Sequence, residues 1–313
     1  MSNQFRLHDI ISMRDISQED IDQILAVSKE MKEHQEKYSS LMKGQIMSAL
    51  FFEASTRTRF SFTTAMQRLG GDVWGFADKA DATSLEKGEN LADTIRMADK
   101  YVDIIVVRHW MEGAARLAAR VADAPVINAG DGGNQHPTQT LLDLFTIKNL
   151  KGKIGGLTVA MIGDLKHART MRSLALALGM YGVELVFVNP PSLDMGRTIV
   201  NELKEKYGIT PIEEPDITNS IVKNADVWYI CRIQKERYLD PLEAKRLTEA
   251  FKITLDTLED TKQDLCILHP LPKIDEIDPR IDELPQAKYF EQAAYGIPVR
   301  MAIIKLLLER KEE

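Results

Sequence analysis

Residues 51–60 read FFEASTRTRF, and they join two segments of different periodicity. The segment that leads into them, residues 46–52, is IMSALFF, a continuous apolar run typical of a strand that is buried on both faces. After them, Phe62 and Met66 recur at helical spacing until a pair of glycines, 70–71, ends the pattern. The sequence therefore predicts a strand that passes through a short turn into a helix.

This turn carries groups that suit a bound phosphate. The first N–H groups of a helix lack partners within the helix, and they point outward at the positive end of its dipole. The hydroxyls of Ser55, Thr56 and Thr58 add donors, and the guanidinium of Arg57 adds a bidentate, charged one. An ordinary capped helix with two solvated arginines, Arg57 and Arg59, explains the same residues. From the residues alone, both interpretations stay open.

Bulk properties describe a globular protein of two domains. The chain has 313 residues, which fits two domains of about 150 residues each. Its residues are 44% hydrophobic and 28% charged, as in globular proteins that fold in water. The net charge of -7 argues against a general nucleic-acid binder, so an anionic ligand must be bound by locally gathered cations.

The cysteines and the distribution of apolar residues indicate the cellular compartment. Cys231 and Cys266 lie in apolar runs with no disulfide or metal-ligand spacing, which predicts reduced core residues in the cytoplasm and no metal site. Residues 1–11 lack the apolar core of a signal peptide, and no run approaches the roughly 20 apolar residues that cross a bilayer. We therefore expect no membrane partner.

Strands alternate with helices along the chain, which predicts an α/β fold with parallel sheets. Further strands are expected at residues 72–76, 102–107, 125–130, 157–164, 184–188, 225–231 and 265–268. Gly152 and Gly155 precede a strand instead of following one, so they do not form a dinucleotide-binding signature, and we expect no cofactor.

Polar residues follow several of these strands. Arg108 comes directly after the strand at 102–107, at the edge where open α/β sheets bind ligands. His136 and Gln139 lie three residues apart at the start of a helix, so their side chains can point the same way. Residues 77–88 form a polar loop that, taken alone, reads as a flexible surface connection.

Four motifs together resemble the aspartate/ornithine carbamoyltransferase family, and the resemblance spans nearly the whole chain. They are STRTR at 55–59, a loop with Ser84 and Lys87 before GENLADTI at 88–95, HPTQ at 136–139 and HPLP at 269–272. The ornithine branch usually carries His-Cys-Leu-Pro at the last motif, so HPLP favours the aspartate branch. Lys273 stands where an arginine is more usual, which leaves any role of that position undefined.

The resemblance implies two domains, each a mostly parallel sheet flanked by helices. Residues 1–149 would bind carbamoyl phosphate and residues 150–291 would bind aspartate. Residues 292–313 would form a C-terminal helix that returns to the first domain.

The resemblance also implies the site residues. The expected catalytic residues are Arg57, His136 and Lys87. Carbamoyl phosphate would be bound by Ser55, Thr56, Arg57, Thr58, Ser84, Arg108, His136, Gln139 and the backbone carbonyls of Leu271 and Pro272. Aspartate would be bound by Lys87, Arg169, Arg232 and Gln234.

The implied activity is transfer of the carbamoyl group of carbamoyl phosphate to L-aspartate, an early step of pyrimidine biosynthesis. The alternatives are transfer to another amine, such as ornithine, and a homologue that binds ligand without catalysis. The family's loop enters a neighbouring active site, so Ser84 and Lys87 imply a homotrimer with shared sites. A separate regulatory chain is a possible further partner.

Overall fold

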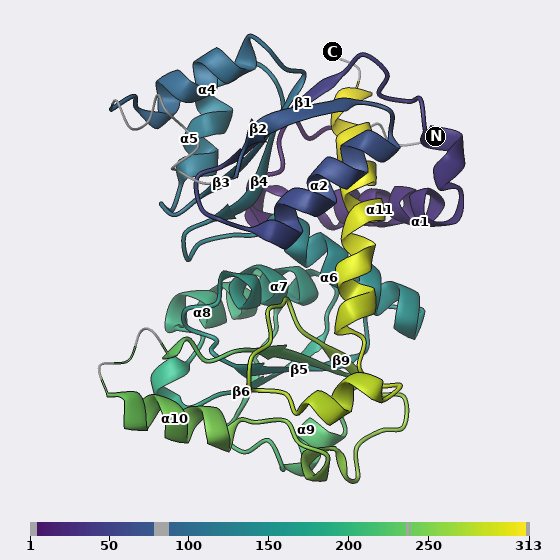
Figure 1. Cartoon of the computed structure of the whole chain (residues 1–313). Helices are drawn as coiled ribbons and strands as arrows, with labels where there is room; N and C mark the ends of the chain where they lie inside the picture. Colours follow the sequence, from purple (N-terminus) through teal and green to yellow (C-terminus); the bar gives the residue numbers. More distant parts are fainter. Residues whose placement is uncertain (1–4, 78–87, 236–237, 239, 311–313) are drawn as a thin grey trace. The chain divides into compact units, whose positions relative to one another are not determined.

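The computed structural model describes residues 5–77, 88–235, 238 and 240–310, and the chain divides into two compact units (Figure 1). The first unit comprises Met1–Phe145 and Tyr295–Glu313, and the second comprises Thr146–Ala294. The divisions fall inside two helices, α6 (Pro137–Lys151) and α11 (Tyr289–Leu308), so both helices contribute residues to each unit.

The first unit is built on a sheet of four strands in the order β2-β1-β3-β4, all parallel. The strands are β1 (Ile46–Phe51), β2 (Asp72–Phe76), β3 (Ile104–His109) and β4 (Val126–Asp131). Every residue of β3, a central strand, and of β4, an edge strand of the sheet, is buried.

Helices cover both faces of this sheet. On one face, α4 (Leu91–Asp99) and α5 (Ala114–Val121) pack through Ile95 and Ala118 onto Leu50 and Val107 of the strands. Figure 1 shows α2 (Thr56–Arg68) and α11 on the other face. In α2 the residues at helical spacing, Phe62 and Met66, are fully buried, which confirms the helix that the sequence predicts.

The C-terminal helix packs within the first unit, as expected. Tyr295 of α11 meets the ring of Phe145 edge-on, with 5.3 Å between ring centroids. Its hydroxyl accepts a hydrogen bond of 3.2 Å from Lys32 of α1 (Gln18–Glu33). Five residues further along α11, the guanidinium of Arg300 lies over the ring of Phe62, 4.8 Å from its centroid. These contacts join α11 to α1, α2 and α6.

The second unit holds a sheet of five parallel strands in the order β7-β6-β5-β8-β9. The strands are β5 (Thr158–Gly163), β6 (Glu184–Val188), β7 (Ile212–Glu214), β8 (Val227–Cys231) and β9 (Cys266–Leu268). Figure 1 shows α7 (Arg169–Met180) and α8 (Arg197–Tyr207) on one face of the sheet, and α9 (Ser220–Lys223) and α10 (Pro241–Ala250) on the other.

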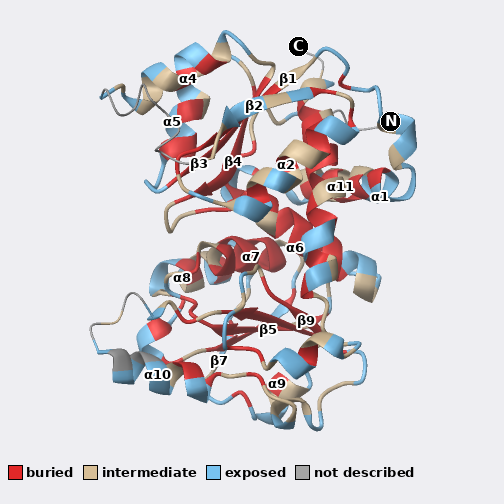
Figure 2. Cartoon of the chain, in the orientation of Figure 1, coloured by how far each residue is buried: buried red, intermediate tan, exposed pale blue. Residues whose placement is uncertain are grey.

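The core of the second unit follows the strand alternation. Ile162, Trp228 and Ile267 point from neighbouring strands into one cluster of buried residues. Figure 2 shows β5 and β9 as almost entirely buried and the outward sides of the helices as exposed. Cys231 and Cys266 are both free and buried, as expected.

Two details of the expected strands are wrong. β3 extends to His109, so Arg108 lies inside the strand and does not follow it. Arg108 is tolerated inside a buried strand because its guanidinium donates hydrogen bonds to the carboxylate of Glu53 and to the backbone carbonyl of Ala129. The short edge strand β7 was missed, because its three residues, IEE, lack any apolar run.

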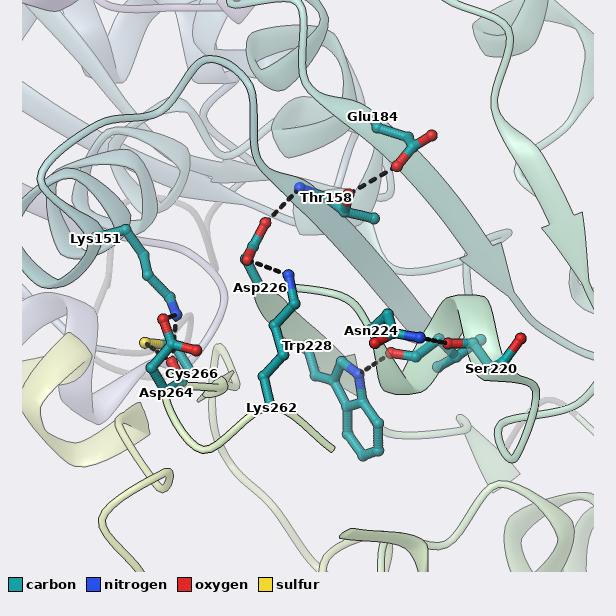
Figure 3. A network of polar contacts seen from close by, with 11 residues as sticks. Lys151, Thr158, Glu184, Ser220, Asn224, Asp226, Trp228, Lys262, Asp264 and Cys266 are labelled. Carbon is teal, nitrogen blue, oxygen red and sulfur yellow. Dashed lines mark hydrogen bonds and ion pairs between the residues drawn. The ribbon is translucent and has the colours of Figure 1, made fainter. Parts of the chain in front are cut away.

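A network of polar contacts links the amino-terminal ends of β5, β8 and β9 in the second sheet (Figure 3). Asp226, just before β8, accepts hydrogen bonds from the backbone N–H of Thr158 (2.9 Å) and from Lys262 (2.6 Å). Lys151 forms an ion pair of 2.9 Å with Asp264, just before β9. Burial alone would raise the pKa of Asp226, but the hydrogen bonds and charge of Lys262 and the Thr158 N–H lower it below its ordinary value.

We predict that Asp226→Asn lowers the free energy of unfolding by about 1–3 kcal/mol at pH 7, because one donor then faces the new amide nitrogen. A carboxylate with a lowered folded-state pKa stabilises above its unfolded-state pKa of about 3.9. That stabilisation is lost as the pH falls through the lower folded-state value, so the difference between variant and wild type should shrink there. Urea denaturation followed from pH 7 to acid pH measures it.

The matched control is Glu213→Gln, the same charge change at an exposed position of β7. It should change stability by less than about 0.5 kcal/mol. Equal stability of Asp226→Asn and wild type at pH 7 would show that the network contributes nothing.

Candidate functional site

In each sheet the strand order reverses at one pair of neighbours. From β1 the chain continues to β2 on one side and then crosses to β3 on the other. From β5 it continues to β6 and later crosses to β8. Open α/β sheets bind ligands at the carboxyl ends of the strands at such a reversal, because the two following loops run in opposite directions there. The segments after β1 and β3, and after β5 and β8, are therefore the candidate sites of the two units.

The segment after β1 is the turn into α2. The carbonyl of Ser55 accepts the first hydrogen bond of the helix, from the N–H of Arg59 at 3.2 Å. The N–H groups of Thr56, Arg57 and Thr58 precede that bond and lie at the positive end of the helix dipole. Among the described residues, the Ser55 hydroxyl caps no N–H group of α2. The turn therefore offers a set of donors to an anion.

The side chains of this turn differ in exposure. Thr58 is buried, whereas Arg57 and Thr56 are exposed. Nearby protein atoms partly desolvate the guanidinium of Arg57 and lower its pKa from the ordinary value, yet an arginine stays protonated at neutral pH. An accessible cation beside free N–H groups is suited to bind a phosphate bidentately.

Arg108 lies at the adjacent end of β3, opposite Phe51 of β1. Its guanidinium donates to the carboxylate of Glu53 at 2.7 Å and to the backbone carbonyl of Ala129 at 3.0 Å. Glu53 is part of the turn after β1, so this ion pair joins the turn to β3 and β4. Glu53 lies just before the STRTR motif at 55–59, but only the register of β1 against β3 reveals its partner.

His136 and Gln139 are delivered by the segment after β4. The carbonyl of His136 accepts from the N–H groups of Gln139 (3.0 Å) and Thr140 (3.2 Å), so His136 begins the helix α6. Its side chain is 95% buried. Both residues lie at the carboxyl end of the strand next to β3, and the expected helix start at Pro137 is confirmed.

Asp131 fixes the path of the chain between β4 and α6. Its buried carboxylate accepts from the N–H of Gly113 (2.8 Å) and of Gln135 (3.1 Å), and from the amide of Asn128 (2.9 Å). The sequence alone does not reveal these partners of Asp131. Its role depends on two segments, residues 128–135 and the segment at Gly113, that meet only in the folded chain.

His109, at the end of β3, is packed in the core. Its ring stacks on Trp110 with 4.1 Å between centroids, and its Nδ1 accepts from the N–H of Met111 at 2.9 Å. Burial lowers the pKa of His109 and outweighs the opposite effect of Glu53 and Asp131. The ring is therefore a neutral part of the core.

In the second unit, two arginines lie at the carboxyl ends of neighbouring strands. Arg169 is the first residue of α7, which follows β5, and Arg232 directly follows β8. Gly163 and Cys231, the last residues of these strands, are register partners. Both arginines are half-buried, as is Gln234 two residues on. This edge therefore presents two cationic forks, which is the arrangement that a dicarboxylate requires.

Cys231 gives this edge no nucleophile. Burial, with the charge of Asp164 next, raises the pKa of its thiol to about 12. A thiol with that pKa stays protonated at neutral pH and is unreactive. The chemistry of this edge therefore depends on charge and hydrogen bonding.

The segment after β9 holds Leu271 in a specific conformation. Leu271 has φ of 56°, and its peptide bond to Pro272 is cis. The N–H of Leu271 donates to Nδ1 of His269 at 2.8 Å, and Nε2 of His269 lies 2.8 Å from the carboxylate of Glu276. Because Nδ1 accepts, the proton is on Nε2, which donates to Glu276. Burial would raise the pKa of Glu276, but this hydrogen bond lowers it.

Two expected site residues, Ser84 and Lys87, lie outside the described residues. Within the described ranges, no group of His, Cys, Asp and Glu side chains is arranged to hold a metal ion. A search of the same residues finds no helix with the length and hydropathy of a membrane span.

Comparison with known proteins identifies related sequences over both units. The family model described as "Aspartate/ornithine carbamoyltransferase, carbamoyl-P binding domain" matches residues 8–149. The model described as "Aspartate/ornithine carbamoyltransferase, Asp/Orn binding domain" matches residues 155–307. The aspartate carbamoyltransferase catalytic subunit of Methanothermobacter thermautotrophicus is 51% identical over 305 residues, which are 97% of this chain and 96% of that protein.

Solved structures are similar throughout. The catalytic subunit of M. jannaschii aspartate transcarbamoylase is 47% identical with a TM-score of 0.90, over 97% of this chain and 98% of that one. Aspartate transcarbamoylase from Trypanosoma cruzi, in complex with carbamoyl phosphate and aspartate, is 35% identical with a TM-score of 0.89. That match covers 97% of this chain and 96% of the other.

If the turn after β1 binds phosphate, removing its exposed cation should weaken phosphate binding. Replacing Arg57 by Ala should weaken binding of inorganic phosphate by about 10- to 100-fold, because a charged hydrogen-bond donor contributes about 1.5–3 kcal/mol. Isothermal titration calorimetry of the purified chain measures it. Arg68→Ala, at the other end of the same helix, is the matched control and should leave binding unchanged. If both variants bound phosphate like wild type, the turn would be only a capped helix.

Proposed function

The chain belongs to the aspartate/ornithine carbamoyltransferase family, and on that premise we propose how its residues transfer the carbamoyl group of carbamoyl phosphate to L-aspartate. The products are N-carbamoyl-L-aspartate and phosphate, at an early step of pyrimidine biosynthesis. The observation that carries the assignment of residues is the placement of cationic groups at the strand-order reversal of each sheet.

The first unit binds carbamoyl phosphate in this proposal. The domain comprises residues 1–149 and 292–313. The phosphate accepts hydrogen bonds from the N–H groups and hydroxyls of the turn after β1 and from the guanidiniums of Arg57 and Arg108. The phosphate ligands from this unit are Ser55, Thr56, Arg57, Thr58 and Arg108, and Ser84 is a further one. These groups neutralise the charge that the leaving phosphate gains.

The carbamoyl end is fixed by its own donors and acceptors. His136 donates to the carbonyl oxygen and stabilises the negative charge that develops on it during attack. The carbamoyl NH₂ group donates to the side-chain oxygen of Gln139 and to the backbone carbonyls of Leu271 and Pro272. The φ of 56° at Leu271 and its bond to His269 support this role, because they hold the backbone in one conformation.

The second unit, residues 150–291, binds aspartate. Arg169 and Arg232 each receive a carboxylate bidentately, and Gln234 adds a hydrogen bond. Lys87 completes the set of cations. Two arginines favour a dicarboxylate over ornithine, whose side chain ends in an ammonium group that they repel.

The reaction is direct attack of the aspartate amine on the carbamoyl carbon. A C–N bond forms, the carbonyl electron pair moves to oxygen, and its return expels phosphate as the C–O bond breaks. The amine loses one proton in the process, and the departing phosphate is one acceptor for it. The rate enhancement then comes from positioning and charge stabilisation, in which Arg57, His136 and Lys87 have the central parts.

The experiment that tests this function offers purified protein carbamoyl phosphate with a panel of amines. We predict phosphate release with L-aspartate and a rate at least about 100-fold lower with ornithine, since a buried unpaired charge costs several kcal/mol. The product is identified by mass spectrometry. A faster reaction with ornithine would support the other branch of the family. Binding of carbamoyl phosphate without phosphate release in the presence of any of the amines would support a ligand-binding homologue.

We also propose a homotrimer whose active sites are shared between neighbouring subunits. Ser84 and Lys87 of one subunit would complete the site that contains Arg57 and His136 of the next. The relatives are called catalytic subunits, which supports a separate regulatory chain as a further partner. The cytoplasmic location expected from the sequence stays a prediction.

Shared sites predict complementation between two inactive variants. Lys87→Ala and His136→Ala should each lose almost all activity, but subunits exchanged between them form hybrid trimers. Random mixing leaves roughly a quarter of the sites with both native residues, because each residue comes from a different subunit. Activity should therefore return to roughly a quarter of the wild-type value. No recovery in hybrids confirmed by mass spectrometry would contradict shared sites.

A further inference from the structure

A charged group is buried beneath the candidate site of the first unit, and the proposed reaction does not use it. Asp143 of α6 is fully buried, and its carboxylate accepts a hydrogen bond of 2.8 Å from Nε2 of Gln139, one helical turn earlier. Gln139 itself is only partly buried at the start of the helix. A polar chain thus runs from the surface of the site into the core.

The chain continues to the C-terminal helix. Arg300 of α11 is 97% buried, and the charge of Asp143 acts on it. Its guanidinium lies over Phe62 of α2, the helix that begins at the phosphate turn. Burial lowers the pKa of Arg300 to about 9, which Asp143 opposes, so the guanidinium is still protonated at neutral pH.

Gly296 makes room for this arginine. A Cβ atom at position 296 would collide with the guanidinium of Arg300 one turn further along α11. The side chain of Leu142, on α6, lies 3.5 Å from the same point. The buried arginine of α11 therefore packs against residues of α2 and α6, the helix that carries Asp143.

We propose that Asp143 and Arg300 are positioning residues that orient the Gln139 amide, so that its oxygen accepts from the NH₂ group of the carbamoyl substrate. The inference rests on the proposed function and adds to it a determinant of specificity. An ionised carboxylate only accepts hydrogen bonds, so the amide nitrogen of Gln139 must face Asp143. The amide oxygen then points away from Asp143 and can accept a hydrogen bond only from a donor group of the substrate, such as the carbamoyl NH₂.

Arg300 keeps Asp143 in the state that this orientation requires. An isolated carboxylate in the core would be protonated, and it could then donate to the amide oxygen. The amide would turn over and present its own NH₂ group to the substrate, where two donors would face each other. The buried cation favours the ionised carboxylate and so excludes this arrangement.

The test compares two ligands that differ at one group. Carbamoyl phosphate carries an NH₂ group where acetyl phosphate carries CH₃. Asp143→Asn keeps the shape of the side chain but can donate to Gln139. We expect its KM for carbamoyl phosphate to rise about tenfold, the effect of one hydrogen bond, while competitive inhibition by acetyl phosphate changes less than about twofold. Arg300→Met should also reduce the preference of the site for carbamoyl phosphate over acetyl phosphate.

A double variant and a control complete the experiment. Adding Asp143→Asn to Gln139→Ala should cause no further loss of preference, because Asp143 acts only through Gln139. Leu144→Ala removes a fully buried side chain from the next position of α6. It should lower the melting temperature and leave the preference unchanged.

Two outcomes would overturn the proposal. One is an unchanged preference for carbamoyl phosphate over acetyl phosphate in Asp143→Asn, whether or not both ligands are weakened equally, and the other is a further loss of preference in the double variant. Failure of the proposed function would look different, because the wild-type protein would then show no preference for carbamoyl phosphate and no transfer to any amine.

Discussion

The site depends on one constraint of parallel sheets, which is that all strands end at the same edge. Residues far apart in the sequence, such as Ser55 and Arg108, come together because β1 and β3 are neighbours that end side by side. The same holds for Arg169 and Arg232 after β5 and β8. In both units the polar residues gather where the strand order reverses, so the loops there are free to hold a ligand. In the function that we propose, the carbamoyltransferase chemistry depends on the cations that occupy these two places.

A second feature is that buried ion pairs and hydrogen bonds hold the polar side chains in position. Arg108 pairs with Glu53, His269 pairs with Glu276, and Asp143 holds Gln139. Each pair lies directly behind a residue that we assign to substrate binding. Charges taken out of water add little net stability, so their value here lies in fixed geometry. Donors that are already oriented need no reorganisation as charge develops in the transition state.

The fold was largely predictable because its signals are local. Continuous apolar runs marked the strands, and helical spacing with glycine stops marked the helices, as at residues 46–71. The errors have physical reasons. Arg108 was placed after its strand because a charge is not expected inside a buried one, and β7 lacks the apolar pattern. The motif residues were identified by resemblance, whereas Glu53, Asp131 and Asp143 were not assigned roles. The partner of Asp143, Gln139, lies one helical turn earlier, but Arg108 and Gly113, which donate to Glu53 and Asp131, lie on other segments. Register and packing, which no local pattern encodes, determine such pairs.

The most direct test of this account is a crystal structure of the chain with carbamoyl phosphate bound. We predict that the phosphate oxygens lie within hydrogen-bond distance of the N–H groups at the start of α2 and of the guanidiniums of Arg57 and Arg108. The carbamoyl carbonyl should then face His136. A phosphate bound away from the carboxyl ends of β1 and β3, with the turn at residues 55–59 in contact only with water, would contradict the central claim.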